Sequence, residues 1–159
     1  MITPALMQHI RAQFRLDWQG IHGAPHWARV MHHGLSLARQ TSADVEVIRL
    51  FAVLHDSQRR HDGDDRAHGA RAAEYAWLLR DEGLMHLSDE QLDLLSAACN
   101  GHSDGLIEAD ITVQVCWDSD RLDLGRVGIR PDPRYLCTHE AKRPARIERA
   151  WRWSQGVRL

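Results

Sequence analysis

The side chains best suited to chemistry in this chain are histidines and aspartates that lie at the ends of apolar segments. His55 and Asp56 directly follow the apolar run LFAVL, His26 lies in HGAPHWARV, and Asp120 lies in CWDSDRLDL. Imidazole nitrogens and carboxylate oxygens are common ligands of divalent metal ions. Side chains from separate helices of a bundle can converge on one point. The pattern therefore predicts a metal site built from three distant segments.

Two further histidines are also candidate metal ligands. His68 lies in RAHGARAAEYA and His102 in AACNGHSDG. A carboxylate has two oxygens to share, so Asp56 could bridge a first ion and a second ion held by these two histidines. Asp118 and Asp123 flank Asp120, and spacing alone does not choose the ligand among the three.

Histidine is unusually abundant, with 11 residues in the chain. Each of the other histidines is expected on the surface or hydrogen-bonded in the core, since that is the usual place of a single histidine. His61 follows two arginines and is also a candidate for contact with a substrate. The residues assigned this ordinary role are His9, His22, His32, His33, His61, His86 and His139.

Helical periodicity runs through almost the whole chain, and no sustained strand-like alternation occurs. Capping residues, glycines and prolines mark the ends of each segment. We predict an all-α fold, a single compact domain of six or seven helices over residues 1–159. The expected helices are 3–15, 25–40, 45–55, 65–82, 88–98, 111–124 and a basic last helix from about 138 to 153.

Composition limits the class of protein. Hydrophobic residues make up 43% and charged residues 26% of the chain, and the formal net charge is -2. We expect a soluble, cytoplasmic protein without a membrane partner, because no apolar run approaches the roughly 20 residues that span a bilayer and the N-terminus lacks a signal-peptide layout. The basic last helix could attract anionic substrates, but with so little positive charge nucleic-acid binding is not expected.

The three cysteines are widely spaced and contain no CxxC pair. They indicate free thiols in a reducing compartment rather than a disulfide framework or a thiolate zinc site. The three residues are Cys99, Cys116 and Cys137.

The order of the candidate ligands resembles the HD domain superfamily of metal-dependent phosphohydrolases. The segment HWARV is similar to the family's HxxRV helix, AVLHDSQRR carries the His-Asp doublet, and DSDRLDLGRVG is similar to the ADRLD segment. In that last segment the aspartate before the arginine is the family's ligand, so the resemblance selects Asp120. Extra histidines between the doublet and the last aspartate, here His68 and His102, match members that bind two metals. The chain lacks the HDxGK and GYP segments of cyclic-dinucleotide hydrolases, so that substrate is disfavoured.

The resemblance implies an all-helical core and hydrolysis of a phosphate ester, often a nucleotide, by metal-activated water. Asp56 would bridge metals or orient the water, and Arg59 or Arg60 would neutralise charge on the phosphoryl oxygens. Arg29, one turn beyond His26, is a further candidate, and packing against an acidic neighbour is its alternative. The expected cofactor is one or two divalent ions, of manganese, nickel, cobalt, zinc, magnesium or iron, and the expected partner is a small phosphorylated substrate. Two other functions remain open: a dinuclear iron oxygenase on the same ligands, and a non-catalytic nucleotide-binding regulatory domain.

Overall fold

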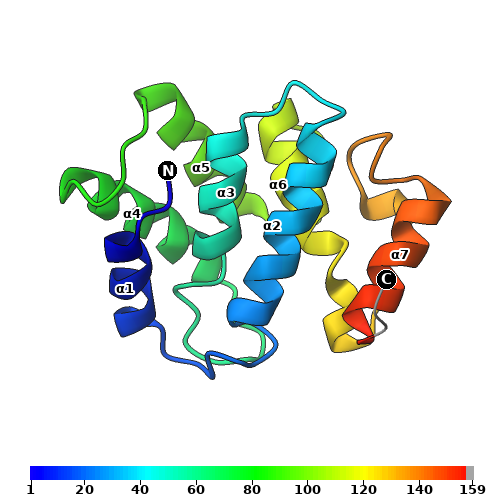
Figure 1. The fold of residues 1–159 in the computed structure, drawn as a ribbon, viewed down its shortest axis with the longest axis horizontal. Coiled ribbons are helices and arrows are strands. Elements are labelled where there is room, and N and C mark those ends of the chain that lie inside the picture. Colours follow the sequence, from blue (N-terminus) through cyan, green and yellow to red (C-terminus); the bar gives the residue numbers. More distant parts are fainter. Residues whose placement is uncertain (157–159) are drawn as a thin grey trace.

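The fold of this chain, a computed structural model, is described for residues 1–156 and is all-helical. Seven α-helices and two short 3-10 helices account for the regular structure, and these residues contain no strand (Figure 1). The all-α prediction is therefore confirmed. The elements are α1 (Pro4–Gln13), α2 (Ala24–Ala38), α3 (Val45–Leu54), α4 (His68–Asp81), α5 (Asp89–Gly101), α6 (Ile111–Arg121), η1 (Leu124–Val127), η2 (Pro133–Tyr135) and α7 (Pro144–Ser154).

Local capping explains where several helices begin. The Thr3 hydroxyl accepts a hydrogen bond from the Leu6 amide at 3.1 Å, and Pro4 occupies the first turn of α1, where its missing N–H costs nothing. At the start of α5, Ser88 and Gln91 form a capping box in which each side chain accepts a bond from the other's backbone amide. These signals are visible in the sequence, so the starts of these helices agree with the prediction to within a residue.

The last helix differs most from the prediction. It begins at Pro144 rather than near residue 138. A proline inside a helix removes a hydrogen bond and forces the preceding residue into an extended conformation, and Arg143 is indeed extended, with φ -62° and ψ 127°. Residues 138–143 instead form turns, in which the Thr138 hydroxyl accepts a bond from the Ala141 amide.

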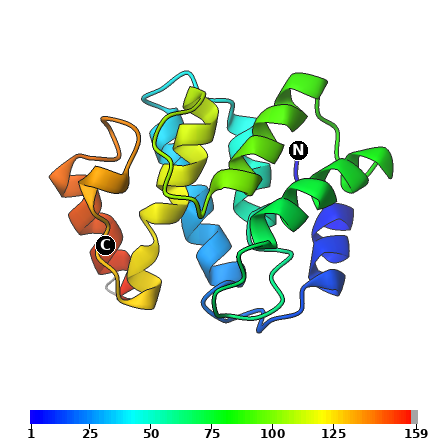
Figure 2. The ribbon, with the colours of Figure 1, turned by 180° about the vertical axis from the view of Figure 1, so that it is seen from behind.

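The core surrounds α3. All but three of its residues are buried, and it packs against α2, α5 and α6. In the two opposite views, α1 and α4 lie at one end of the molecule and α7 at the other, with α2, α3, α5 and α6 between them (Figures 1 and 2). The C-terminal end of α3 therefore delivers His55 and Asp56 to the centre of the molecule.

Within the described residues, no helix combines the length and the apolar character needed to cross a membrane. The three cysteines are free thiols, with Cys99 and Cys116 buried and Cys137 half-buried.

Candidate metal centre

Four predicted ligands converge at one buried point. The Nε2 atoms of His26, in the first turn of α2, and His55, at the end of α3, lie 3.0 Å apart. Oδ2 of Asp56 is 3.6 Å from the first of these nitrogens and 3.7 Å from the second. Oδ1 of Asp120, near the end of α6, is 3.3 Å from His26 and 3.7 Å from His55. Three helices far apart in the sequence thus supply one cluster of donor atoms.

A second cluster shares Asp56. His68 begins α4 and His102 follows α5, and their Nε2 atoms are 2.7 Å apart. The other oxygen of Asp56, Oδ1, is 3.2 Å from His68 Nε2 and 3.7 Å from His102 Nε2. Asp56 therefore presents one oxygen to each histidine pair, as a bridging carboxylate would.

The other ring nitrogens of the four histidines fix how their protons are arranged. Each Nδ1 faces an oxygen that can only accept, a backbone carbonyl or the Asp123 carboxylate, so each Nδ1 must carry the proton. The Nε2 atoms, on the other side of each ring, point toward each other at the centre. The four bonds run from His26 to Asp123 Oδ2 (2.7 Å), from His55 to the Phe51 carbonyl (3.1 Å), from His68 to the Asp65 carbonyl (2.5 Å) and from His102 to the Cys99 carbonyl (2.6 Å).

Several ligand-type atoms at the centre face one another, and the described residues place no hydrogen-bond donor between them. Asp56 Oδ2 and Asp120 Oδ1 are buried and have no hydrogen-bond partner among the described residues. Buried polar atoms normally find partners, and an ion is one of the accepted explanations for those that do not. Imidazole nitrogens and carboxylate oxygens at this density fit a divalent cation. The buried groups His26–His55–Asp56 and Asp56–His68–His102 could each hold one.

The ionisation states at the centre are also those that binding of a divalent cation requires. Burial lowers the pKa of His55 to about 3, so its ring is neutral at pH 7. Burial alone would raise the pKa of Asp56, but the surrounding imidazoles, His55 foremost, hold it well below its ordinary value. Burial also opposes ionisation of Asp120, and there the neighbouring His26 and His55 imidazoles and the Arg126 guanidinium outweigh it and lower the pKa. Both carboxylates are therefore anionic at neutral pH.

The pKa of His102 is raised, whereas that of His55 is lowered. Burial lowers the pKa of His102, but the nearby carboxylates of Asp56 and Asp120 together raise it above the ordinary value. A proton on this ring is itself a cation bound at the centre, which again reflects the excess of negative charge there.

The three aspartates of DSDRLD have three different surroundings. Asp120 alone lies beside the His26–His55 pair. Asp118 accepts bonds from the backbone amides of Cys137 (2.6 Å) and Thr138 (2.8 Å) and is fully buried, so it anchors the segment before α7. Asp123 binds the Nδ1 proton of His26 and thereby orients a ligand, a role that the sequence reading did not assign.

The predicted arginines also differ from one another in their surroundings. Arg59 lies at the centre, where its Nε donates to Asp56 Oδ1 at 2.8 Å, whereas Arg60 is exposed. Arg29 donates from Nε and Nη2 to the two oxygens of Asp123 at 2.6 and 3.0 Å. For Arg29 the structure thus shows the alternative role, an ion pair with an acidic neighbour. Arg126, which was not among the predicted site residues, places Nη2 3.7 Å from Asp120 Oδ1.

A cavity of about 510 Å³ opens onto this centre. Asp120 and His102 reach it from the metal side, and four arginines line it: Arg59, Arg121, Arg126 and Arg130. The remaining wall is partly apolar, formed by Leu124, Ile129, Pro131, Tyr135 and Leu136. His61 is exposed and does not line the cavity. The space suits a small anionic molecule with an apolar part.

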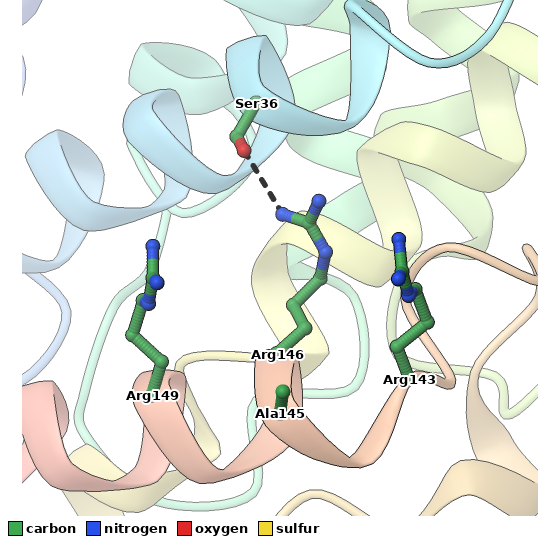
Figure 3. Close-up of a pocket in the computed structure, with 5 residues that line it drawn as sticks. All are labelled: Ser36, Arg143, Ala145, Arg146 and Arg149. Carbon is green, nitrogen blue, oxygen red and sulfur yellow. Dashed lines mark hydrogen bonds between the residues drawn. The ribbon is translucent and has the colours of Figure 1, made fainter.

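A separate hollow of about 210 Å³ lies between α2 and α7. Arg143, just before α7, and Arg146 and Arg149, in its N-terminal half, extend side by side toward α2, where Arg146 donates to the Ser36 hydroxyl at 2.9 Å (Figure 3). None of the six candidate ligands lines this hollow. The positive charge of the basic last helix is thus gathered apart from the candidate metal centre.

Gly69 lies at a point of close contact between α4 and α5 and permits the short distance between them. A Cβ atom at this position would lie 2.5 Å from the Cys99 carbonyl oxygen, a distance that real contacts do not reach. That carbonyl also accepts the proton of His102, and His68 immediately precedes the glycine. The absent side chain therefore lets the two helices approach closely enough for His68 and His102 to meet.

Comparison with known proteins shows the fold. No family model and no curated protein matches the sequence. A crystal structure of a protein described as a predicted HD superfamily hydrolase, from an uncultured Thermotogales bacterium, superposes with a TM-score of 0.70 and 23% sequence identity. The match covers 96% of this chain and 86% of the other. The HD-domain fold expected from the resemblance is confirmed.

Proposed function

We propose that this protein is a metal-dependent phosphohydrolase that acts on a small phosphate ester, with a nucleotide as the leading candidate. The observation that carries the proposal is the joint placement of the six ligand-type side chains and the arginine-lined cavity. The first supplies donors for a metal, and the second supplies positive charge where a phosphate would bind. The solved protein of the same fold is itself described as a predicted hydrolase.

His26, His55, Asp56 and Asp120 would hold one ion, and His68, His102 and Asp56 would hold a second. A bound divalent ion supplies Lewis acidity and lowers the pKa of bound water toward 7. Asp123 keeps the Nε2 lone pair of His26 directed at the centre by taking its Nδ1 proton, and Arg29 holds Asp123 in place through its two hydrogen bonds.

Arg59 and Arg126 would bind the phosphoryl oxygens. Both line the cavity and both lie beside a candidate ligand carboxylate, at 2.8 Å from Asp56 for Arg59 and at 3.7 Å from Asp120 for Arg126. A guanidinium at this place offsets negative charge that grows on the phosphoryl group in the transition state. The apolar wall formed by Ile129, Tyr135 and Leu136 would accept the organic part of the substrate, which favours a nucleotide over a short phosphorylated sugar.

The test combines metal content with turnover. Protein purified without a metal-chelating tag is analysed by mass spectrometry for metal per chain, then assayed against nucleotides and small phosphate esters with each candidate metal. His55→Ala and Asp56→Ala should lose both metal and activity. His139→Ala is the matched control, because the His139 side chain is 92% exposed and should affect neither. Full activity in either variant of the centre would refute the mechanism.

A dinuclear iron oxygenase is the competing function, because four histidines and two aspartates can also hold two irons. The cavity favours the hydrolase, since its arginines suit a phosphate and an oxygenase has no general need for them. Two irons per chain with oxygen consumption, and without phosphate release from any ester, would support the oxygenase instead. Tight metal and nucleotide binding without either reaction would identify a regulatory domain.

A further inference from the structure

Arg121, the last residue of α6, is a buried cation without an anionic partner. Only 7% of its surface is exposed. Its Nη1 donates to the Tyr135 carbonyl at 2.8 Å and approaches the Cys137 sulfur at 3.6 Å, while Nη2 has no partner. No salt bridge with a carboxylate is formed by Arg121 within residues 1–156, and the guanidinium carbon lies 5.4 Å from the centre of the Trp117 ring.

This arrangement is costly unless something supplies the missing charge. A guanidinium does not lose its proton in a protein, so burial cannot be relieved by neutralisation. Buried charges are normally paired, because the desolvation of an unpaired ion is strongly unfavourable. Arg121 lines the same cavity as Asp120 and Arg126. A ligand in that cavity is therefore in a position to provide the anion.

The place of Arg121 differs from that of the arginines at the metal end. Arg59 and Arg126 lie beside the carboxylates of Asp56 and Asp120. The polar contacts of Arg121 are made instead with Tyr135 and Cys137, and Tyr135 and Leu136 also line the cavity. A phosphate at the metal end would engage the first two arginines and leave Arg121 for another group.

We propose that Arg121 binds a second oxyanion of the substrate, a phosphate or a carboxylate, while the ester to be cleaved lies at the metal end. The substrate class is thus a phosphate ester with two anionic groups, separated by a body that contacts Ile129 and Tyr135. Both residues line the cavity and are 54% and 57% exposed, respectively. The inference rests on the proposed function, which supplies the reaction at the metal end.

The experiment compares one-anion and two-anion probes. Phenyl phosphate carries one anionic group. Its 3- and 4-carboxy derivatives add a carboxylate, and the 1,3- and 1,4-benzene bisphosphates add a phosphate. With the metal-loaded wild type, at least one two-anion probe should exceed phenyl phosphate in kcat/KM by about 10- to 100-fold, the range expected of a charge-assisted hydrogen bond. Whether a carboxylate or a bisphosphate probe is preferred identifies the second oxyanion.

Arg121→Met should reduce this preference ratio by the same factor. Arg39→Met is the matched control, because Arg39 is exposed, does not line the cavity and should leave the ratio unchanged. Arg121→Gln replaces the methionine variant if the latter does not fold, and thermal melting reports folding of both. A wild type without preference for any two-anion probe, or an Arg121 variant with the wild-type ratio, would overturn the inference.

Failure of the proposed function is a distinct result. If metal-loaded wild type cleaves none of the probes, the hydrolase proposal fails, and calorimetric Kd values for the same probes decide the role of Arg121. Tighter binding of a two-anion probe that is lost in Arg121→Met supports the anion site without turnover. Equal binding of all probes refutes it.

Discussion

Replacement of Gly69 by alanine should disable the second histidine pair while the fold survives. The new Cβ would lie 2.5 Å from the Cys99 carbonyl oxygen and 3.0 Å from that of Asn100, so α4 and α5 must separate by roughly 1 Å to reach ordinary contact. Overpacking of this kind costs about 1 to 3 kcal/mol, and the better helix propensity of alanine returns about 1 kcal/mol. We therefore expect a net loss of roughly 1 kcal/mol in the free energy of unfolding.

The effect on metal should be larger than the effect on stability. The displaced Cys99 carbonyl fixes the ring of His102, and His68 moves with α4. Loss of a group that orients a ligand typically weakens metal affinity about 10- to 100-fold. Metal titration by calorimetry should show that the second of two ions binds weakly in Gly69→Ala, with the first little changed.

Gly34→Ala provides the matched control for that measurement. Its Cβ would lie 2.5 Å from Cγ2 of Ile48, a clash of the same size at the crossing of α2 and α3, away from His68 and His102. It should lower stability without selective loss of the second ion. Wild-type affinity for both ions in Gly69→Ala, or an identical metal defect in the two variants, would refute the role given to the α4–α5 approach.

Two further predictions concern positions outside the ligand set. Asp123→Asn removes the anionic acceptor of the His26 proton, so metal affinity should fall about 10- to 100-fold, and the rise in melting temperature on adding Mn²⁺ should shrink; an unchanged thermal shift would contradict the orienting role. Burial lowers the pKa of His33 to about 4. Between about pH 6.5 and pH 4 this histidine is therefore protonated in the unfolded chain but not in the folded one, so the free energy of unfolding falls as the pH falls. His33→Phe should remove up to about 3 kcal/mol of that acid sensitivity in urea melts, and equal pH slopes for variant and wild type would contradict it.

Much of the fold follows from local signals in the sequence. Thr3-Pro4, Asp44 and the Ser88–Gln91 pair begin helices in the structure because each satisfies backbone amides that a helix leaves free. Five of the six candidate ligands were likewise identifiable from residue type and position near helix ends, whereas Asp120 was selected over Asp118 and Asp123 only by the family resemblance. Their convergence needed tertiary structure, because no local rule states how α4 and α5 approach α3.

The features that escaped the sequence reading depend on distant partners. Arg29 follows His26 by three residues and was a reasonable candidate for the substrate site, but Asp123, 94 residues away, binds it. Arg121 looks like any arginine of a helix end until the burial and the lack of a carboxylate are known. Pro144 did carry a local signal against a helix that starts near residue 138, and the periodicity of the basic segment concealed it.

The segment from Asp118 to Asp123 assigns three carboxylates to three separate tasks within six residues. One anchors residues 137 and 138, one faces the histidine pair, and one orients His26. Each residue turns a helix by about 100°. Inserting or deleting one residue here would therefore rotate the aspartates after the change relative to those before it, and the three carboxylates could no longer all reach their partners. Residues 103–110, all exposed, face no such constraint. Length variation among related chains should therefore be frequent in that loop and absent from the aspartate segment, where substitutions alone can accumulate.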